Sequence, residues 1–358
     1  MEAINEGNAL LPEKKRYEWI DNARLLAALM IIYAHMWSFF PNDPVVTSQM
    51  AKNFTFATVL YGRVPYFLVL AGYFLGRKIT WHKAVDRAFW LLVPFVIWNF
   101  IVYIAFYSHG ISWEVVRDIP KFLGIGCLFS EDIHICNLPG STPAIKVTWF
   151  LRDIIVLSLL SPILVRFKGV VMGALAVALA FSHFNFMPNA TVMLAPHTCF
   201  YYLLGTCLCN FRIDDAYYIF NKRFTPVFII VLAAAAVNCY VQGWRGRPSM
   251  QVTLLGALFG AMLIAYCGVL IEQYLPKLSK SLAPCGPACF LVFVLHFPIL
   301  SLVAPMLPSW IAGTWLVWLV PIPTCAFIIA VFLLMKRYTP WLMPYLGHMK
   351  VPKKQASQ

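Results

Sequence analysis

Two residues suited to chemistry lie near the start of the chain, inside an apolar segment of about 20 residues. Arg24 and His35 are eleven positions apart. In an α-helix that spacing returns His35 to within about 20° of the face of Arg24, about 16 Å further along the axis. Asp21 lies near the same face and can pair with Arg24 three positions away. The pattern predicts an acid–arginine pair at one end of a helix face and an imidazole in its other half.

An imidazole, with an unperturbed pKa of about 6.5, suits general-base catalysis near neutral pH. A lone buried histidine more often bonds a backbone carbonyl and has no chemical role. The arginine on the same face favours the catalytic interpretation of His35. His296 lies inside a later apolar segment, close to Pro298, and is a second candidate imidazole.

Two further arginines, Arg63 and Arg152, also interrupt apolar segments. An arginine at the centre of a membrane helix costs about 3 kcal/mol, so these side chains must find partners or line a polar cavity. Arg152 lies near the end of its segment, so it either extends to the nearby membrane surface, paired with neighbouring Asp153, or has a role in the site. A separate basic group, formed by Arg77, Lys78, Lys83 and Arg87, lies between the second and third apolar segments. Either it reflects the usual excess of basic residues in cytoplasmic loops, or it grips the phosphates of a nucleotide-containing cofactor.

The elements that must position these residues are transmembrane helices. Of the chain, 61% is apolar and only 12% is charged, which is too little charge to cover a soluble globule. Apolar runs of about 20 residues are long enough to cross a bilayer. We therefore predict an all-α, multi-pass integral membrane protein with about ten transmembrane helices, at about 20–40, 55–75, 88–108, 149–166, 169–185, 194–211, 225–242, 250–271, 287–307 and 313–335.

The distribution of basic residues predicts the orientation of these helices. With ten spans, most lysines and arginines fall on the side of both termini, so both termini are expected to be cytoplasmic. The net charge of +13 is then a topology signal facing an anionic membrane surface, and nucleic acid is not an expected partner. We expect a cytoplasmic tail at 1–16, a membrane domain at 17–340 with an outer loop at about 109–148, and a cytoplasmic tail at 341–358.

The long outer loop contains Cys127, His134 and Cys136. The two cysteines can form a disulfide if the loop faces an oxidising space. They lack the paired spacing of a zinc site, so no metal is expected. The chain also has no GxSxG elbow and no P-loop, which removes support for a serine hydrolase or an ATPase.

Four motifs in order resemble those of the acyltransferase-3 family. The first is Ile-Asp-x-x-Arg at 20–24, followed after ten intervening residues by His35. The second is Val-Pro-Tyr-Phe with Ala-Gly-Tyr at 64–74, and the third is Trp-Phe-Leu-Arg at 149–152. The fourth is His-Phe-Pro at 296–298. The family also has the ten-helix layout with cytoplasmic termini that is predicted here.

The chain departs from this pattern at two places. Ala71 stands where the family has a serine, so any role of that hydroxyl is absent. The family's Arg-x-x-Arg at the start of the third helix is reduced to Arg87 followed by Trp90. Cofactor binding there is expected to be weaker, or to depend on Arg77 and Lys83.

The resemblance implies an enzyme that transfers an acyl group, usually acetyl, from cytoplasmic acyl-CoA to a hydroxyl of a sugar or other glycoconjugate. His35 would take the proton of the acceptor hydroxyl, and Arg63 or His296 would stabilise the oxyanion. The expected location is a bacterial cytoplasmic (inner) membrane, where a homo-oligomer is compatible with the sequence. The expected site residues are His35, Arg24, Asp21 and His296 as catalytic groups, Arg24, Arg77, Lys83 and Arg87 for the cofactor, and Arg63, Trp149 and Arg152 for the acceptor substrate.

A transporter that exports a polysaccharide or its precursor is the main alternative. Proton-coupled carriers also place Asp, Arg and His inside their membrane helices. Many carriers have broken helices at corresponding positions in two halves, and this sequence lacks that pattern. The acceptor itself is not identified by any motif, although the loop at 109–148 is expected to influence its choice.

Overall fold

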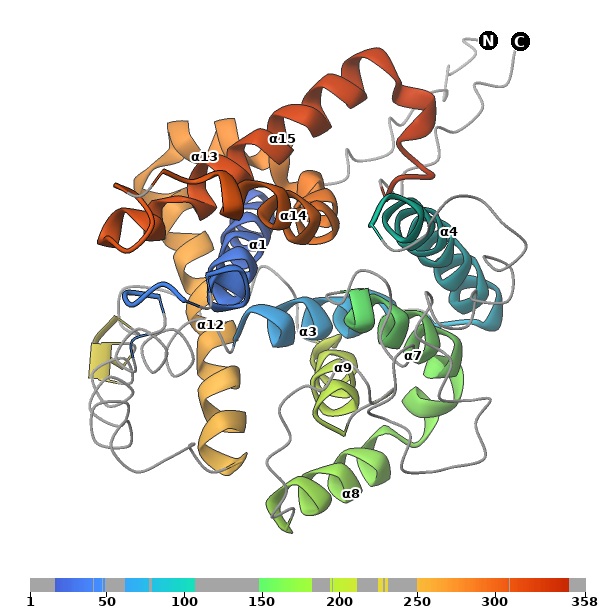
Figure 1. Ribbon diagram of the computed structural model, residues 1–358. Coiled ribbons are helices and arrows are strands. Elements are labelled where there is room, and N and C mark those ends of the chain that lie inside the picture. Colours follow the sequence, from blue (N-terminus) through green and yellow to red (C-terminus); the bar gives the residue numbers. More distant parts are fainter. Residues whose placement is uncertain are drawn as a thin grey trace, which may run out of the picture.

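The computed structural model describes residues 17–40, 42–46, 48, 62–76, 79–106, 148–181, 194, 196–210, 225–227, 229–230, 250–308 and 310–347. These residues form helices and connecting turns, without strands (Figure 1). The α-helices are α1 (Glu18–Phe39), α3 (Arg63–Gly76), α4 (Trp81–Phe106), α7 (Trp149–Arg166), α8 (Lys168–Phe181), α9 (Pro196–Leu208), α12 (Met250–Tyr274), α13 (Pro276–Leu282), α14 (Cys289–Val303) and α15 (Pro321–Tyr338). Short 3₁₀ helices, including η6 (Ala283–Ala288) and η8 (Trp315–Leu319), link the later elements.

The described part is all-helical, as expected of an α-helical integral membrane protein, and its helices overlap nine of the predicted apolar segments. Helices α3 and α9, with 14 and 13 residues, are shorter than the spans predicted there. In the described part, four helices are long and apolar enough to cross a membrane: Trp81–Ala105, Gly256–Tyr274, Pro276–Met306 and Trp315–Tyr338. Most of the predicted span at 225–242 lies outside the described residues. The number of about ten spans and the cytoplasmic location of both termini stay predictions.

The fourth and fifth predicted spans are joined by a sharp bend. Helices α7 and α8 meet at an angle of 110°, with a break of one residue, Phe167. Helix α8 has 14 residues and is therefore about 21 Å long, shorter than the roughly 30 Å hydrocarbon core of a bilayer. The pair can thus form one broken span or a re-entrant segment instead of two straight crossings.

Helix α1 lies at the centre of the helices that hold the candidate site (Figure 1). It packs against α12, α14, α3 and α15, and against the turn η6. Its buried side chains include Ala28, Ile32 and Met36, which join an apolar cluster with α14 and α15. A helix enclosed in this way presents Asp21, Arg24 and His35 to neighbouring helices.

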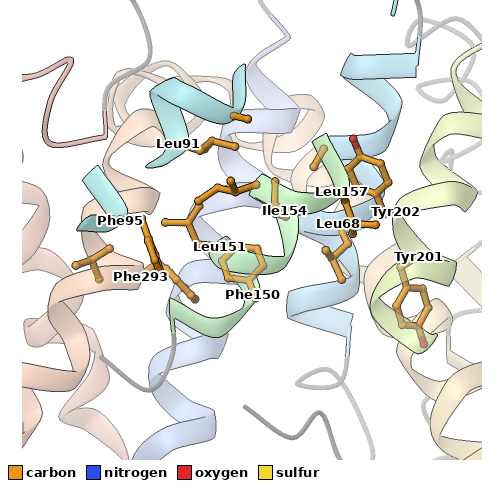
Figure 2. Packing of buried hydrophobic residues seen from close by; sticks show 14 of the residues in the cluster. Leu68, Leu91, Phe95, Phe150, Leu151, Ile154, Leu157, Tyr201, Tyr202 and Phe293 are labelled. Atoms are coloured by element: carbon orange, nitrogen blue, oxygen red, sulfur yellow. The ribbon is translucent and has the colours of Figure 1, made fainter. Parts of the chain in front are cut away.

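A second apolar cluster connects α7 to α3, α4, α9 and α14. Figure 2 shows Phe150, Leu151 and Ile154 of α7 among Leu68, Phe95 and Phe293 of these helices. The rings of Phe150 and Phe293 meet edge to face, with centroids 4.5 Å apart. This packing fixes the first turn of α7 beside the middle of α14, where His296 lies.

Candidate functional site

The two candidate imidazoles lie side by side, although 261 positions separate them in the sequence. The ring centroids of His35 on α1 and His296 on α14 are 5.3 Å apart, and the rings are tilted by 36°. Phe297 packs against His35 at 5.9 Å and against Phe39 at 4.6 Å. Helix α1 packs directly on α14, and this contact places both histidines beside the ring of Phe297.

The two imidazoles differ in exposure and in hydrogen bonding. His35 is partly exposed, whereas His296 is fully buried. Nδ1 of His296 lies 3.0 Å from the carbonyl oxygen of Val292. Because a carbonyl can only accept, Nδ1 carries the proton and Nε2 has a free lone pair. Nε2 is buried and has no hydrogen-bond partner among the described residues.

Arg63, the first residue of α3, belongs to the same end of the site. Its guanidinium is close enough to both His35 and His296 to interact with them electrostatically. One helical turn later, Phe67 lies 6.3 Å from the ring of Phe150. The guanidinium of Arg63 therefore supplies N–H donors to a region in which the neighbouring side chains are mostly aromatic.

Arg24 forms the other end of the site with its expected partner. Its Nη1 lies 3.6 Å from Oδ1 of Asp21, and its guanidinium lies 5.9 Å from the ring centre of Phe74. Arg24 also interacts electrostatically with Arg87 of α4. The Nε of Arg87 is buried and has no hydrogen-bond partner within the described ranges, and the hydroxyl of Tyr202 is nearby. Arg24 and Arg87 thus bring two guanidinium groups close together at this end of α1.

The remaining predicted residues are more dispersed. Lys83 is exposed in the first turn of α4, one turn before Arg87, and Arg77 lies outside the described residues. Trp149 is partly buried, with its ring 6.4 Å from that of Phe150. Arg152 is buried, and its Nε lies 3.3 Å from Oδ1 of Asp153, so the expected ion pair is present while its role in the site stays a prediction.

A polar network around the first turn of α1 was not found from the sequence. Asn22 donates to the hydroxyl of Ser279 at 2.8 Å, and that hydroxyl donates to Glu18 at 2.9 Å. The backbone N–H of Trp19 donates to Glu272 at 3.2 Å. These bonds tie the start of α1 to α12 and α13. The polar residues at the start of an apolar helix were the available signal, but they do not reveal distant partners.

Metal ligands do not gather in the described ranges: they contain no group of three or more His, Cys, Asp or Glu side chains placed to hold a metal ion. The loop residues Cys127, His134 and Cys136 lie outside these ranges, so their pairing stays untested.

Helical membrane architecture and ionisable groups on facing helices place the protein among membrane enzymes and carriers. Residues 17–337 match the model of a protein family described as an acyltransferase domain, acyltransferase 3, and so include both ends of the site. The chain therefore belongs to the acyltransferase-3 family and is a membrane acyltransferase. No curated protein and no solved structure matches the chain.

Proposed function

We propose that the protein transfers an acyl group, with acetyl as the first candidate, from cytoplasmic acyl-CoA to a hydroxyl of a sugar or glycoconjugate. One observation carries this proposal. Arg24 and Arg87 bring two guanidinium groups together at one end of α1, while His35 lies beside Arg63 about 16 Å along the same helix. The separation of these two ends suits acyl-CoA, because its pantetheine arm separates the phosphates from the thioester.

The arginine end suits the phosphate groups of CoA. Guanidinium groups bind phosphate oxygens with paired, charge-assisted hydrogen bonds. The buried Nε of Arg87 has no hydrogen-bond partner in the part of the chain that the structure describes, and a bound anion would satisfy it. In this proposal Asp21 orients Arg24 through their ion pair, and Lys83 with Arg77 attracts the cofactor from the cytoplasm.

The imidazole end suits the transfer step. His35 takes the proton of the acceptor hydroxyl as the oxygen attacks the thioester carbon. Arg63 stabilises the oxyanion that forms. The intermediate then collapses, the carbon–sulfur bond breaks, and the thiolate of CoA takes the proton from His35. Since Nε2 of His296 carries no proton, Arg63 is a better oxyanion donor than His296.

The acceptor is proposed to approach past the first turn of α7. Trp149 offers a partly buried aromatic surface there, of the kind that packs against a sugar ring, and Arg152 lies three residues further along the same helix. Phe150 links this turn through Phe293 to the ring of His296, at centroid distances of 4.5 and 6.3 Å. A bacterial cytoplasmic membrane is the proposed location of the reaction.

Release of free CoA from acetyl-CoA by the purified protein in liposomes tests this function. We expect His35→Ala to lower kcat about a hundredfold or more, because the general base is removed. Arg24→Ala should mainly raise KM for acetyl-CoA. His82→Ala, which changes an exposed histidine at the start of α4, is the matched control and should keep wild-type rates.

The proposal is wrong if the folded protein neither binds nor consumes acyl-CoA, or if His35→Ala keeps full activity. In the first case, transport of labelled glycans across the same liposomes would test the exporter alternative.

A further inference from the structure

We infer that His296 is a positioning residue that fixes the orientation and the tautomer of His35. This inference rests on the proposed function, in which His35 is the general base. It starts from the difference between the two imidazoles: His35 is partly exposed and can meet a substrate, while His296 is fully buried. A group without access to the acceptor can act only through its neighbour.

The hydrogen bond to Val292 determines what His296 can offer. With Nδ1 donating to that carbonyl at 3.0 Å, the ring is held against its own helix and Nε2 is left as an acceptor. A buried acceptor without a donor is unfavourable, so a donor among its neighbours is expected to pair with it.

The neighbours of His296 narrow the choice of donor. Among the described residues, the rings near it are those of Phe293, Phe297 and His35, and of these three only His35 carries an N–H group. Arg63 is the other nearby donor, but it is proposed to bind the oxyanion. His35 is therefore the donor that matches the free lone pair of His296.

This pairing would organise the transfer step. One ring nitrogen of His35 keeps its proton and donates it to Nε2 of His296, so the other nitrogen is bare and faces the acceptor hydroxyl. When His35 takes the hydroxyl proton, the same hydrogen bond stabilises the imidazolium. The proton then passes to the thiolate of CoA as the carbon–sulfur bond breaks, and both histidines return to their starting states. In serine hydrolases a carboxylate orients the base in the same way.

Steady-state kinetics of two substitutions at His296 test the inference. His296→Phe keeps a ring of similar size but removes the acceptor, and we expect kcat to fall about tenfold to a hundredfold, with KM for acetyl-CoA within about twofold of wild type. His296→Gln restores an acceptor oxygen and should recover part of the loss. His197→Phe is the matched control, because it replaces another histidine whose ring nitrogens are buried, at the start of α9, and it should keep kcat within about twofold.

The double substitution His35→Ala with His296→Phe separates positioning from packing. If His296 acts through His35, the double variant should be no slower than His35→Ala alone. The inference is overturned if His296→Phe retains wild-type kcat, if Gln gives no recovery over Phe, or if the two losses multiply. A fully active His35→Ala variant would instead refute the proposed function, so the two failures are distinguishable.

Discussion

The carboxylate of Asp21 lies close to the guanidinium of Arg24 and to the backbone of Gly286. A Cβ atom added to Gly286 would lie 2.5 Å from Oδ1 of Asp21, closer than real Cβ contacts come. Glycine at this position of η6 therefore allows the turn to reach α1 and leaves the carboxylate free to pair with Arg24. At the residue scale, the ion pair at the arginine end requires glycine at position 286 as well as the charged side chains of Asp21 and Arg24.

Gly286→Ala should weaken cofactor binding without removing the general base. The added methyl displaces Asp21 from Arg24, so we expect KM for acetyl-CoA to rise several-fold while kcat changes little. Gly256→Ala on α12 is the control, because a Cβ there meets nothing within 4 Å. Equal KM values for the two variants would show that Asp21 tolerates the displacement.

The sequence predicted the face shared by Arg24 and His35, because the periodicity of a helix alone places them. It also identified His296 and Arg63 as candidates, since ionisable residues in apolar segments need partners. It could not show that His296 meets His35 or that Ser279 meets Asn22. Those contacts depend on how α14 and α13 pack on α1, and a single sequence contains no information about that packing.

At the scale of elements, α3 and α9 form the most extensive helix–helix contact in the described part of the chain. A Cβ atom on Gly72 of α3 would overlap the carbonyl of Tyr202, and one on Gly205 of α9 would overlap the carbonyl of Val69. Small residues facing each other are typical of helix pairs in membranes, where close packing replaces the hydrophobic effect. This pair positions two parts of the site, because α3 begins with Arg63 and α9 places Tyr202 near Arg87.

Gly205→Ala should destabilise the folded protein by about 1–3 kcal/mol, because α9 must move away from α3 to accommodate the methyl. Thermal unfolding in detergent, with size-exclusion chromatography as the readout, measures this loss of stability. Gly173→Ala on α8 provides the control, since a Cβ there meets nothing within 4 Å. The close packing of α3 on α9 would be contradicted by equal unfolding temperatures of the two variants.

The existence of the helices was predictable from the apolar runs, but the bend between α7 and α8 was not. Both sides of Phe167 are apolar, and two runs separated by a short break are compatible with a straight, bent or reversed path. The direction is set by packing: α7 lies on α4 and α9, while α8 lies against α9 and α12. The number of membrane crossings in this part of the chain therefore requires a measurement.

At the scale of the whole molecule, the charge distribution predicts that both termini are cytoplasmic. A reporter that fluoresces only in the cytoplasm should be active when fused after Gln358, and a phosphatase active only outside should be inactive there. The opposite pattern would place the C-terminus outside and contradict the prediction for that terminus. Phosphatase fusions near residue 130, in the predicted outer loop, are expected to be active and provide the internal control.

The enclosure of α1 by its neighbours has a consequence for the choice of acyl donor. Arg24 and His35 are on one continuous helix, so domain movement cannot change the distance between them. Under the proposed function, α1 fixes the distance between the residue that binds the CoA phosphates and the residue that acts at the thioester. The pantetheine arm of the donor must match this distance. Such an enzyme should accept only donors with a pantetheine arm of the full length, and it should accept a wider range of acyl chains. Donors with a shortened pantetheine would then fail even when they carry the preferred acyl group.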